Sequence, residues 1–105
     1  MKTSTANIPT ENASKYLQQL CKHFGRRISV QYTATSGSLD FPFGHSDLFA
    51  DETHIILKPT AKAEDLPRLE EVLASHLSRF AFRENPTITW QTADGGTHKT
   101  GEFTC

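Results

Sequence analysis

The stretch ASKYLQQLCKHFGRRISVQYTAT, residues 13–35, changes from one hydrophobic period to another. In its first half the apolar residues recur every three or four positions, which is typical of a helix with one buried face. From Ile28 to Thr35 apolar and polar residues alternate, which predicts a strand with one buried face. We expect Gly25 to end the helix in a left-handed conformation. The helical stripe consists of Ala13, Tyr16, Leu17, Leu20, Cys21 and Phe24.

Strands are predicted on both sides of this stretch. Residues 3–8 are rich in threonine and are followed by Pro9, so we interpret them as an edge strand. Alternation resumes over residues 39–50, where Pro42 predicts a bulge or bend within one returning strand. Residues 54–58 form a further strand. The first helix is therefore followed by an expected three-stranded meander.

A second helix is predicted from about residue 64 to the Asn85-Pro86 pair, which stops it. Residues 87–91 then form a last short strand, and we expect residues 93–105 to be a flexible tail. The second helix has its own apolar stripe, which includes Leu66, Leu69, Val72, Leu73, Leu77 and Phe80.

Neither helix can bury its stripe alone, and the sheet offers one alternating face. We therefore expect residues 1–92 to form one α+β domain, a two-layer sandwich with two amphipathic helices on one face of the sheet. The sheet should be mostly antiparallel and contain about five strands. The expected order is strand, helix, three strands, helix and strand.

The charge and hydropathy patterns exclude several classes of function. The net charge is −1, so the chain has no excess of basic residues, and this disfavours a nucleic-acid partner. No apolar run is long enough to span a membrane, and the N-terminus does not have the pattern of a signal peptide. The two cysteines have no disulfide or metal-binding spacing. We expect a cytoplasmic protein with no membrane partner.

His76 is the most informative candidate for a binding site, because it falls inside the apolar stripe of the second helix. It is either a hydrogen-bonded core residue or one wall of a pocket. Arg79 and Arg83 lie on the same side of the helix and could join His76 around a carboxylate or phosphate. The simpler alternative is that the arginines pair with Glu84 or cap carbonyls. The predicted apolar walls are Phe41, Phe43 and Phe80.

A metal site is a further hypothesis. His23, His45 and His76 could approach one another if the helices lie side by side. No local pair of ligands, such as two histidines one helical turn apart, supports this site.

An enzyme is the least favoured class. Cys21 lies on a buried stripe, where a thiol behaves as a small hydrophobe. The sequence contains neither a nucleophile elbow nor a glycine-rich phosphate loop. No cofactor is indicated.

Four stretches resemble the bacterial domain of unknown function 2218. They are Ala6–Thr10, Tyr16–His23, the Phe41–Gly44 bend and His76–Glu84. The resemblance implies a small cytoplasmic domain and an association with siderophore-interacting flavoproteins, but it assigns no role to any residue.

These observations favour a non-enzymatic domain that binds a small anionic ligand or a metal complex, accessory to iron or siderophore handling. The alternative is a protein-interaction module that docks on a partner enzyme through the exposed sheet face or an unpaired edge strand.

Overall fold

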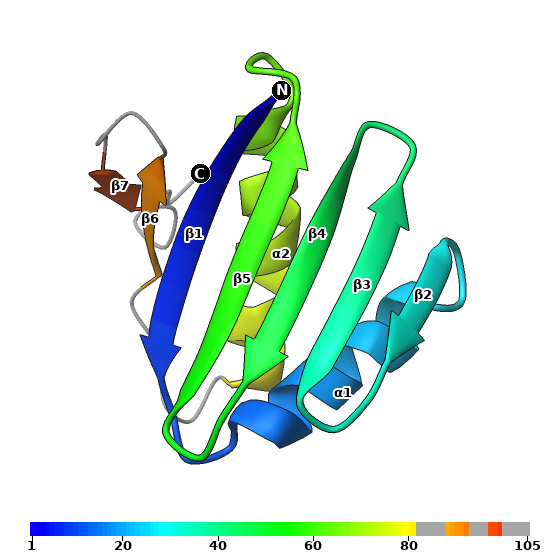
Figure 1. Ribbon diagram of the computed structural model, residues 1–105, viewed down its shortest axis with the longest axis vertical. Coiled ribbons are helices and arrows are strands. Elements are labelled where there is room, and N and C mark those ends of the chain that lie inside the picture. Colours follow the sequence, from blue (N-terminus) through cyan, green and yellow to red (C-terminus); the bar gives the residue numbers. More distant parts are fainter. Residues whose placement is uncertain (82–87, 93–96, 100–105) are drawn as a thin grey trace.

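The computed structural model describes residues 1–81, 88–92 and 97–99. These residues form two helices packed on one sheet (Figure 1). The helices are α1 (Ala13–Phe24) and α2 (Leu66–Phe80). The strands are β1 (Lys2–Pro9), β2 (Ser29–Tyr32), β3 (Ser36–Phe41), β4 (Gly44–Ala50), β5 (His54–Ala61), β6 (Thr89–Thr92) and β7 (Thr97–Lys99).

The sheet has the strand order β2-β3-β4-β5-β1-β6-β7, and each neighbouring pair is antiparallel. Figure 1 shows both helices on the same side of the sheet, with α2 behind β5 and α1 crossing behind β3 and β4. The predicted two-layer α+β sandwich is therefore confirmed.

The strand count was too low, because Pro42 does not lie within one bent strand. Pro42 and Phe43 form a turn, and Phe41 pairs directly with Gly44 across it. Proline is well suited to such a turn because its φ is already fixed near the required value. The predicted strand over residues 39–50 is thus a hairpin of β3 and β4, and the meander has four strands.

The position of β1 also differs from the sequence prediction. β1 lies inside the sheet, where it pairs with β5 on one side and with β6 on the other. Pro9 is the last residue of β1, so its missing N–H lies at the end of the strand and does not interrupt the hydrogen bonds between strands. The edge-strand interpretation was wrong because the partner on the second side comes from the far end of the chain.

The C-terminal predictions are tested in part. The last strand is confirmed as β6, and Thr97–Lys99, which we expected in a tail, form β7 against it. Arg83 and the Asn85-Pro86 pair lie outside the described residues, as do residues 93–96 and 100–105.

The core lies between the helices and the sheet. The predicted stripe of α1 is buried in full, and α2 contributes Leu69, Leu73 and Leu77. Each fully buried leucine contributes about 1.5–3 kcal/mol of transfer free energy. This buried layer holds both helices against the same face of the sheet.

Gly25 does not adopt the expected left-handed conformation. Its φ of −60° and ψ of −13° are right-handed helical, and its N–H donates to the Cys21 carbonyl. A Cβ at this position would lie 3.0 Å from that same carbonyl oxygen. The close approach, rather than a positive φ, accounts for glycine here.

The other face of the sheet carries no helix among the described elements, and we refer to it as the open face (Figure 1). Alternation along each strand decides which side chains it carries. In β4 the residues Ser46, Leu48 and Ala50 are buried towards the helices, and the residues between them project from the open face. From β3 and β4 the open face receives Ser36, Ser38, Asp40, His45, Asp47 and Phe49.

Candidate functional site

Aromatic rings from the C-terminal halves of α1 and α2 lie together, and the group continues onto the β3–β4 hairpin through Phe24. We refer to this group, which consists of His23, Phe24, Phe41, Phe43, His76 and Phe80, as the helix-end cluster. Its centre is the contact between the rings of His23 and His76, whose centroids are 4.7 Å apart. Phe24 lies 4.9 Å from His76, and Phe80 lies 6.0 Å from His23. The two helices thus contribute two rings each.

The hairpin extends the cluster from the end of α1 to the first turn of α2. Phe41 contacts Phe24 edge to face at 5.2 Å, and Phe43 lies 5.7 Å from Phe41. The guanidinium of Arg68 lies 4.3 Å above the Phe43 ring, within the range of a cation–π interaction. The three predicted apolar walls are therefore part of one connected group with His76.

His76 is half-buried, so it lies at the edge of the core and not in its interior. Its Nδ1 lies 2.7 Å from the Val72 carbonyl oxygen, to which it donates a hydrogen bond. This bond fixes the tautomer, so Nε2 of the neutral ring keeps its lone pair. His76 is thus held in place by its own helix and keeps one nitrogen available.

The electrostatic surroundings of His23 are cationic. Partial desolvation lowers the pKa of His23, and the neighbouring His76, Arg26, Arg27 and Arg79 lower it further. Each of these groups disfavours a positive charge on the ring. Arg79 therefore acts on the predicted site through its charge, and its side chain is exposed.

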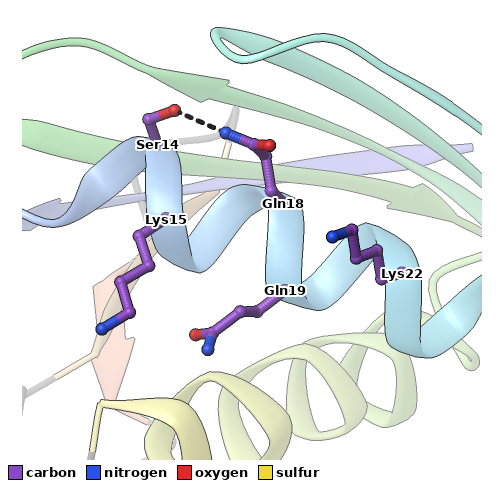
Figure 2. A pocket seen from close by; sticks show the side chains of 5 residues that line it. All are labelled: Ser14, Lys15, Gln18, Gln19 and Lys22. Carbon is purple, nitrogen blue, oxygen red and sulfur yellow. Dashed lines mark hydrogen bonds between the residues drawn. The ribbon is translucent and has the colours of Figure 1, made fainter.

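A shallow hollow continues this cationic surface along α1. It is lined by Ser14, Lys15, Gln18, Gln19 and Lys22 (Figure 2). Gln18 Nε2 donates a hydrogen bond to Ser14 Oγ at 3.0 Å. The Oε1 of Gln19 is buried and, among the described residues, has no hydrogen-bond partner. The hollow places Lys15 and Lys22 on the flank of α1, the helix that carries His23 in its last turn.

His45 does not join the other two predicted metal ligands, because it projects from the open face of the sheet. Its Nδ1 lies 2.6 Å from Asp40 Oδ1, and its Nε2 lies 2.9 Å from Asp47 Oδ1. Hydrogen bonds donated by the ring to Asp47 and then to Asp40 raise the pKa of His45, and partial burial opposes them. The described part of the chain contains no group of three or more His, Cys, Asp or Glu residues arranged for a metal ion. The structure therefore pairs His23 with His76 and leaves His45 apart.

The arrangement of Asp40, His45 and Asp47 was missed at the level of sequence. His45 and Asp47 are two positions apart on one strand, so their side chains share a face. Asp40 lies opposite His45 only because the turn contains two residues, Pro42 and Phe43. A hairpin assignment at this proline would have revealed the cluster.

Neither Cys21 nor Ser38 has the surroundings of a catalytic nucleophile. Cys21 is fully buried, and burial raises the pKa of its thiol to about 11. The thiol therefore stays protonated near neutral pH. Ser38 Oγ lies 3.5 Å from His45 Nε2, but Asp47 lies closer to that nitrogen. A ring that donates from both nitrogens cannot accept a proton from the serine.

The comparisons with known proteins address the family of the chain. Residues 5–91 match the family model described as uncharacterized proteins conserved in bacteria (DUF2218). The chain belongs to this family. It is also similar to PA4090 of Pseudomonas aeruginosa, a protein whose structure was determined by NMR.

The likeness to PA4090 extends over nearly the whole domain. The two proteins share 36% sequence identity, and the match covers 87% of this chain and 96% of PA4090, with a TM-score of 0.75. No curated protein matches the chain. Among the described residues, no helix is long and apolar enough to cross a membrane. Membership in the DUF2218 family confirms the resemblance and assigns no activity.

Proposed function

We propose that the domain binds a small anionic ligand at the helix-end cluster. The observation that carries the proposal is the contact between His23 and His76, two imidazoles held 4.7 Å apart among three arginines. Each of the three arginines carries a positive charge, so an anion placed among them is attracted by all three.

The charges around the cluster are available to a ligand. Arg26, Arg27 and Arg79 are exposed, and within the described residues none of them takes part in an ion pair. An arginine can donate two parallel hydrogen bonds to a carboxylate or a phosphate. His76 supplies one further polar contact from a fixed orientation.

The neighbouring phenylalanines favour a ligand with an apolar part. Phe41, Phe43 and Phe80 are half-buried and pack against the core, so each ring keeps an accessible edge. Ligand sites commonly combine apolar walls with a few convergent polar groups. Carboxylates with a hydrophobic portion fit this description, and so do anionic ferric complexes such as ferric siderophores.

The proposal is tested by titration of the purified domain with citrate, inorganic phosphate and ferric citrate, followed by amide chemical shifts. The variant is Arg79→Gln, which removes one exposed cation beside the cluster. Its matched control is Lys58→Gln, which removes one exposed cation from the open face. We expect Arg79→Gln to weaken citrate binding about tenfold, the worth of one hydrogen bond between charged groups. Lys58→Gln should weaken it by less than about twofold at physiological salt.

Equal effects of the two variants would show general attraction of anions and overturn the placement. A flat titration with all three probes would overturn ligand binding itself.

Docking of a protein partner is the second candidate, because β2 is an edge strand whose Ser29, Gln31 and Tyr32 are exposed. An edge strand offers unpaired backbone groups to another chain. This candidate predicts no saturable response to any of the three anions. The titration therefore separates the two functions.

A further inference from the structure

The helix-end cluster contains two nitrogen donors of the kind that transition metals prefer. His23 and His76 come from different helices, and their ring centroids are 4.7 Å apart. With a metal–nitrogen bond of about 2.0–2.1 Å, two imidazoles on neighbouring positions of one metal ion have centroids about 4.5–5.3 Å apart. The observed separation is therefore in the range of two rings that share one ion.

Both rings can offer a lone pair to a metal. The Nδ1–H of His76 donates to the Val72 carbonyl oxygen, and this is the only hydrogen bond of the ring within the described part of the chain. Nε2 is therefore left as the nitrogen that can bind a metal. His23 is exposed and forms no hydrogen bond with any described residue. The lowered pKa of His23 favours its neutral ring, which is the form that binds metals.

The two histidines supply only part of a coordination sphere. Transition-metal ions in proteins take four or more ligands. The described residues contain no group of three or more His, Cys, Asp or Glu side chains that could surround an ion. An ion held by His23 and His76 must therefore keep ligands that it brings from solution.

The charges around the pair decide the nature of these additional ligands. Arg26, Arg27 and Arg79 act on His23 as positive charges, and they would repel a bare divalent ion in the same way. A chelator with several carboxylates reverses the charge of the complex, so the arginines attract it. The half-buried rings of Phe41 and Phe80 can contact its carbon skeleton.

We infer that His23 and His76 together take a transition-metal ion delivered as an anionic carboxylate chelate with two neighbouring exchangeable positions. This inference rests on the proposed anion site and names its ligand class. The two imidazole nitrogens displace two water molecules from the ion, and no electron is transferred. Imidazole suits Ni²⁺, Cu²⁺ and Zn²⁺, whereas Mg²⁺ and Ca²⁺ prefer oxygen ligands. A complex whose chelator fills every position has nothing to exchange, and it would bind through charge alone.

The test compares two complexes of equal charge on the purified domain by isothermal titration calorimetry. Nickel(II) nitrilotriacetate carries one negative charge and holds water at two neighbouring positions. Cobalt(III)–EDTA carries the same charge and has no exchangeable position. We expect the nickel complex to bind at least about tenfold more tightly than the cobalt complex, because two imidazoles bind one ion as a chelating pair.

Variants show whether this preference depends on the two histidines. His23→Gln and His76→Gln each remove one nitrogen donor, so each should bring the ratio of the two affinities close to one. His54→Gln is the matched control, because it removes an imidazole at the start of β5 and should leave the ratio unchanged. A thermal melt of each variant confirms that it is folded. Since His23 is exposed, its variant keeps the test valid even if His76→Gln unfolds.

The outcomes separate this inference from the proposed anion site. Equal affinities of the unaltered domain for the two complexes would overturn the inference and leave the anion site standing. Binding of neither complex would overturn both. A preference for nickel that survives His23→Gln, or that His54→Gln reduces equally, would place the coordination elsewhere and overturn the inference.

Discussion

Two histidines of the same chain have opposite surroundings. His23 lies among His76, Arg26, Arg27 and Arg79, and its pKa is lowered by partial desolvation and by these cations. His45 lies between two aspartates on the open face, and its pKa is raised by their hydrogen bonds. The net charge of −1 hides this separation completely. The comparison shows that the arrangement of charge, and not its sum, decides which ligands each surface can attract.

The largest expected difference between the two faces of the sheet is in how much a packed ring contributes to the free energy of unfolding. Phe24 is 8% exposed and contacts Phe41 and His76, whereas Phe49 is 43% exposed. We expect Phe24→Ala to lower the free energy of unfolding by about 3–5 kcal/mol. Phe49→Ala should change it by less than about 0.5 kcal/mol. Urea denaturation followed by circular dichroism measures both values.

Equal losses for the two variants would mean that the open face is packed against something in solution. A second copy of the chain is the simplest such partner, and the loss would then depend on protein concentration.

A finer comparison uses two neighbouring residues of β3 that face opposite ways. A Cβ on Gly37 would lie 2.8 Å from Cys21 Sγ, whereas Ser38 projects from the open face. We expect Gly37→Ala to cost about 1–3 kcal/mol through overpacking. Ser38→Ala should cost less than about 0.5 kcal/mol. Thermal melts followed by circular dichroism compare the two variants.

A double-mutant cycle can isolate the cause of the stability loss in Gly37→Ala. Cys21→Ala removes the sulfur that the new methyl group of Gly37→Ala would overlap, so the double variant should recover part of the stability lost by Gly37→Ala. Additive effects would show that the strain lies in the backbone of β3 and not in its contact with α1.

The elements with a local period were predictable from the sequence. The stripe from Ala13 to Phe24 and the alternation after Ile28 each depend on neighbours within a few residues. The structure confirms the buried stripe and a strand at Ser29–Tyr32, but this edge strand has no buried residue, so the predicted buried face was wrong. The central position of β1 was not predictable in this way. It depends on β6, which lies more than eighty residues further along the chain. Periodicity shows which face of a strand is buried, but it does not show which strands lie beside it.

The same limit applies to the candidate sites. The helical stripe identified His76, and the aromatic walls followed from their own strand and helix patterns. The contact between His23 and His76 depends on how two helices cross. The pairing of Asp40 with His45 depends on a two-residue turn at Pro42, which we interpreted as a bend. Register and crossing angle are set by the assembled core, so the sequence alone left them open.

The two histidines should titrate on opposite sides of the unperturbed pKa of about 6.5. Ring-proton shifts in NMR should give a pKa below this value for His23 and above it for His45. Asp40→Asn should lower the pKa of His45, because it removes one of the two hydrogen-bonding carboxylates. Glu52→Gln, which removes a carboxylate from the neighbouring turn, should leave it nearly unchanged.

The two shifts have opposite consequences for stability. The folded-state pKa of His45 is raised, so its contribution is fully present below about pH 6.5 and is lost as pH rises through the folded pKa. The folded-state pKa of His23 is lowered, so the native state loses stability as pH falls through about 6.5. Urea titrations of His45→Gln and His23→Gln at several pH values would separate the two contributions. Identical pH profiles for the two variants would contradict the comparison.

The smallest expected effect concerns Arg79, the least of the groups that lower the pKa of His23. Arg79→Gln should raise this pKa slightly, because it removes one positive charge near the ring. Lys58→Gln, on the open face, should leave it unchanged. NMR titration of His23 in both variants measures the difference at low salt, where screening is weakest.

The result also bears on how an anion would bind. If Arg79→Gln raises the pKa of His23, the arginine and the imidazole act on the same region of space, and one anion can neutralise both. If the pKa does not move while citrate binding weakens, Arg79 contacts the ligand at a point where His23 does not sense it. The ligand would then lie over α2, and His23 would influence it only through the ring of His76.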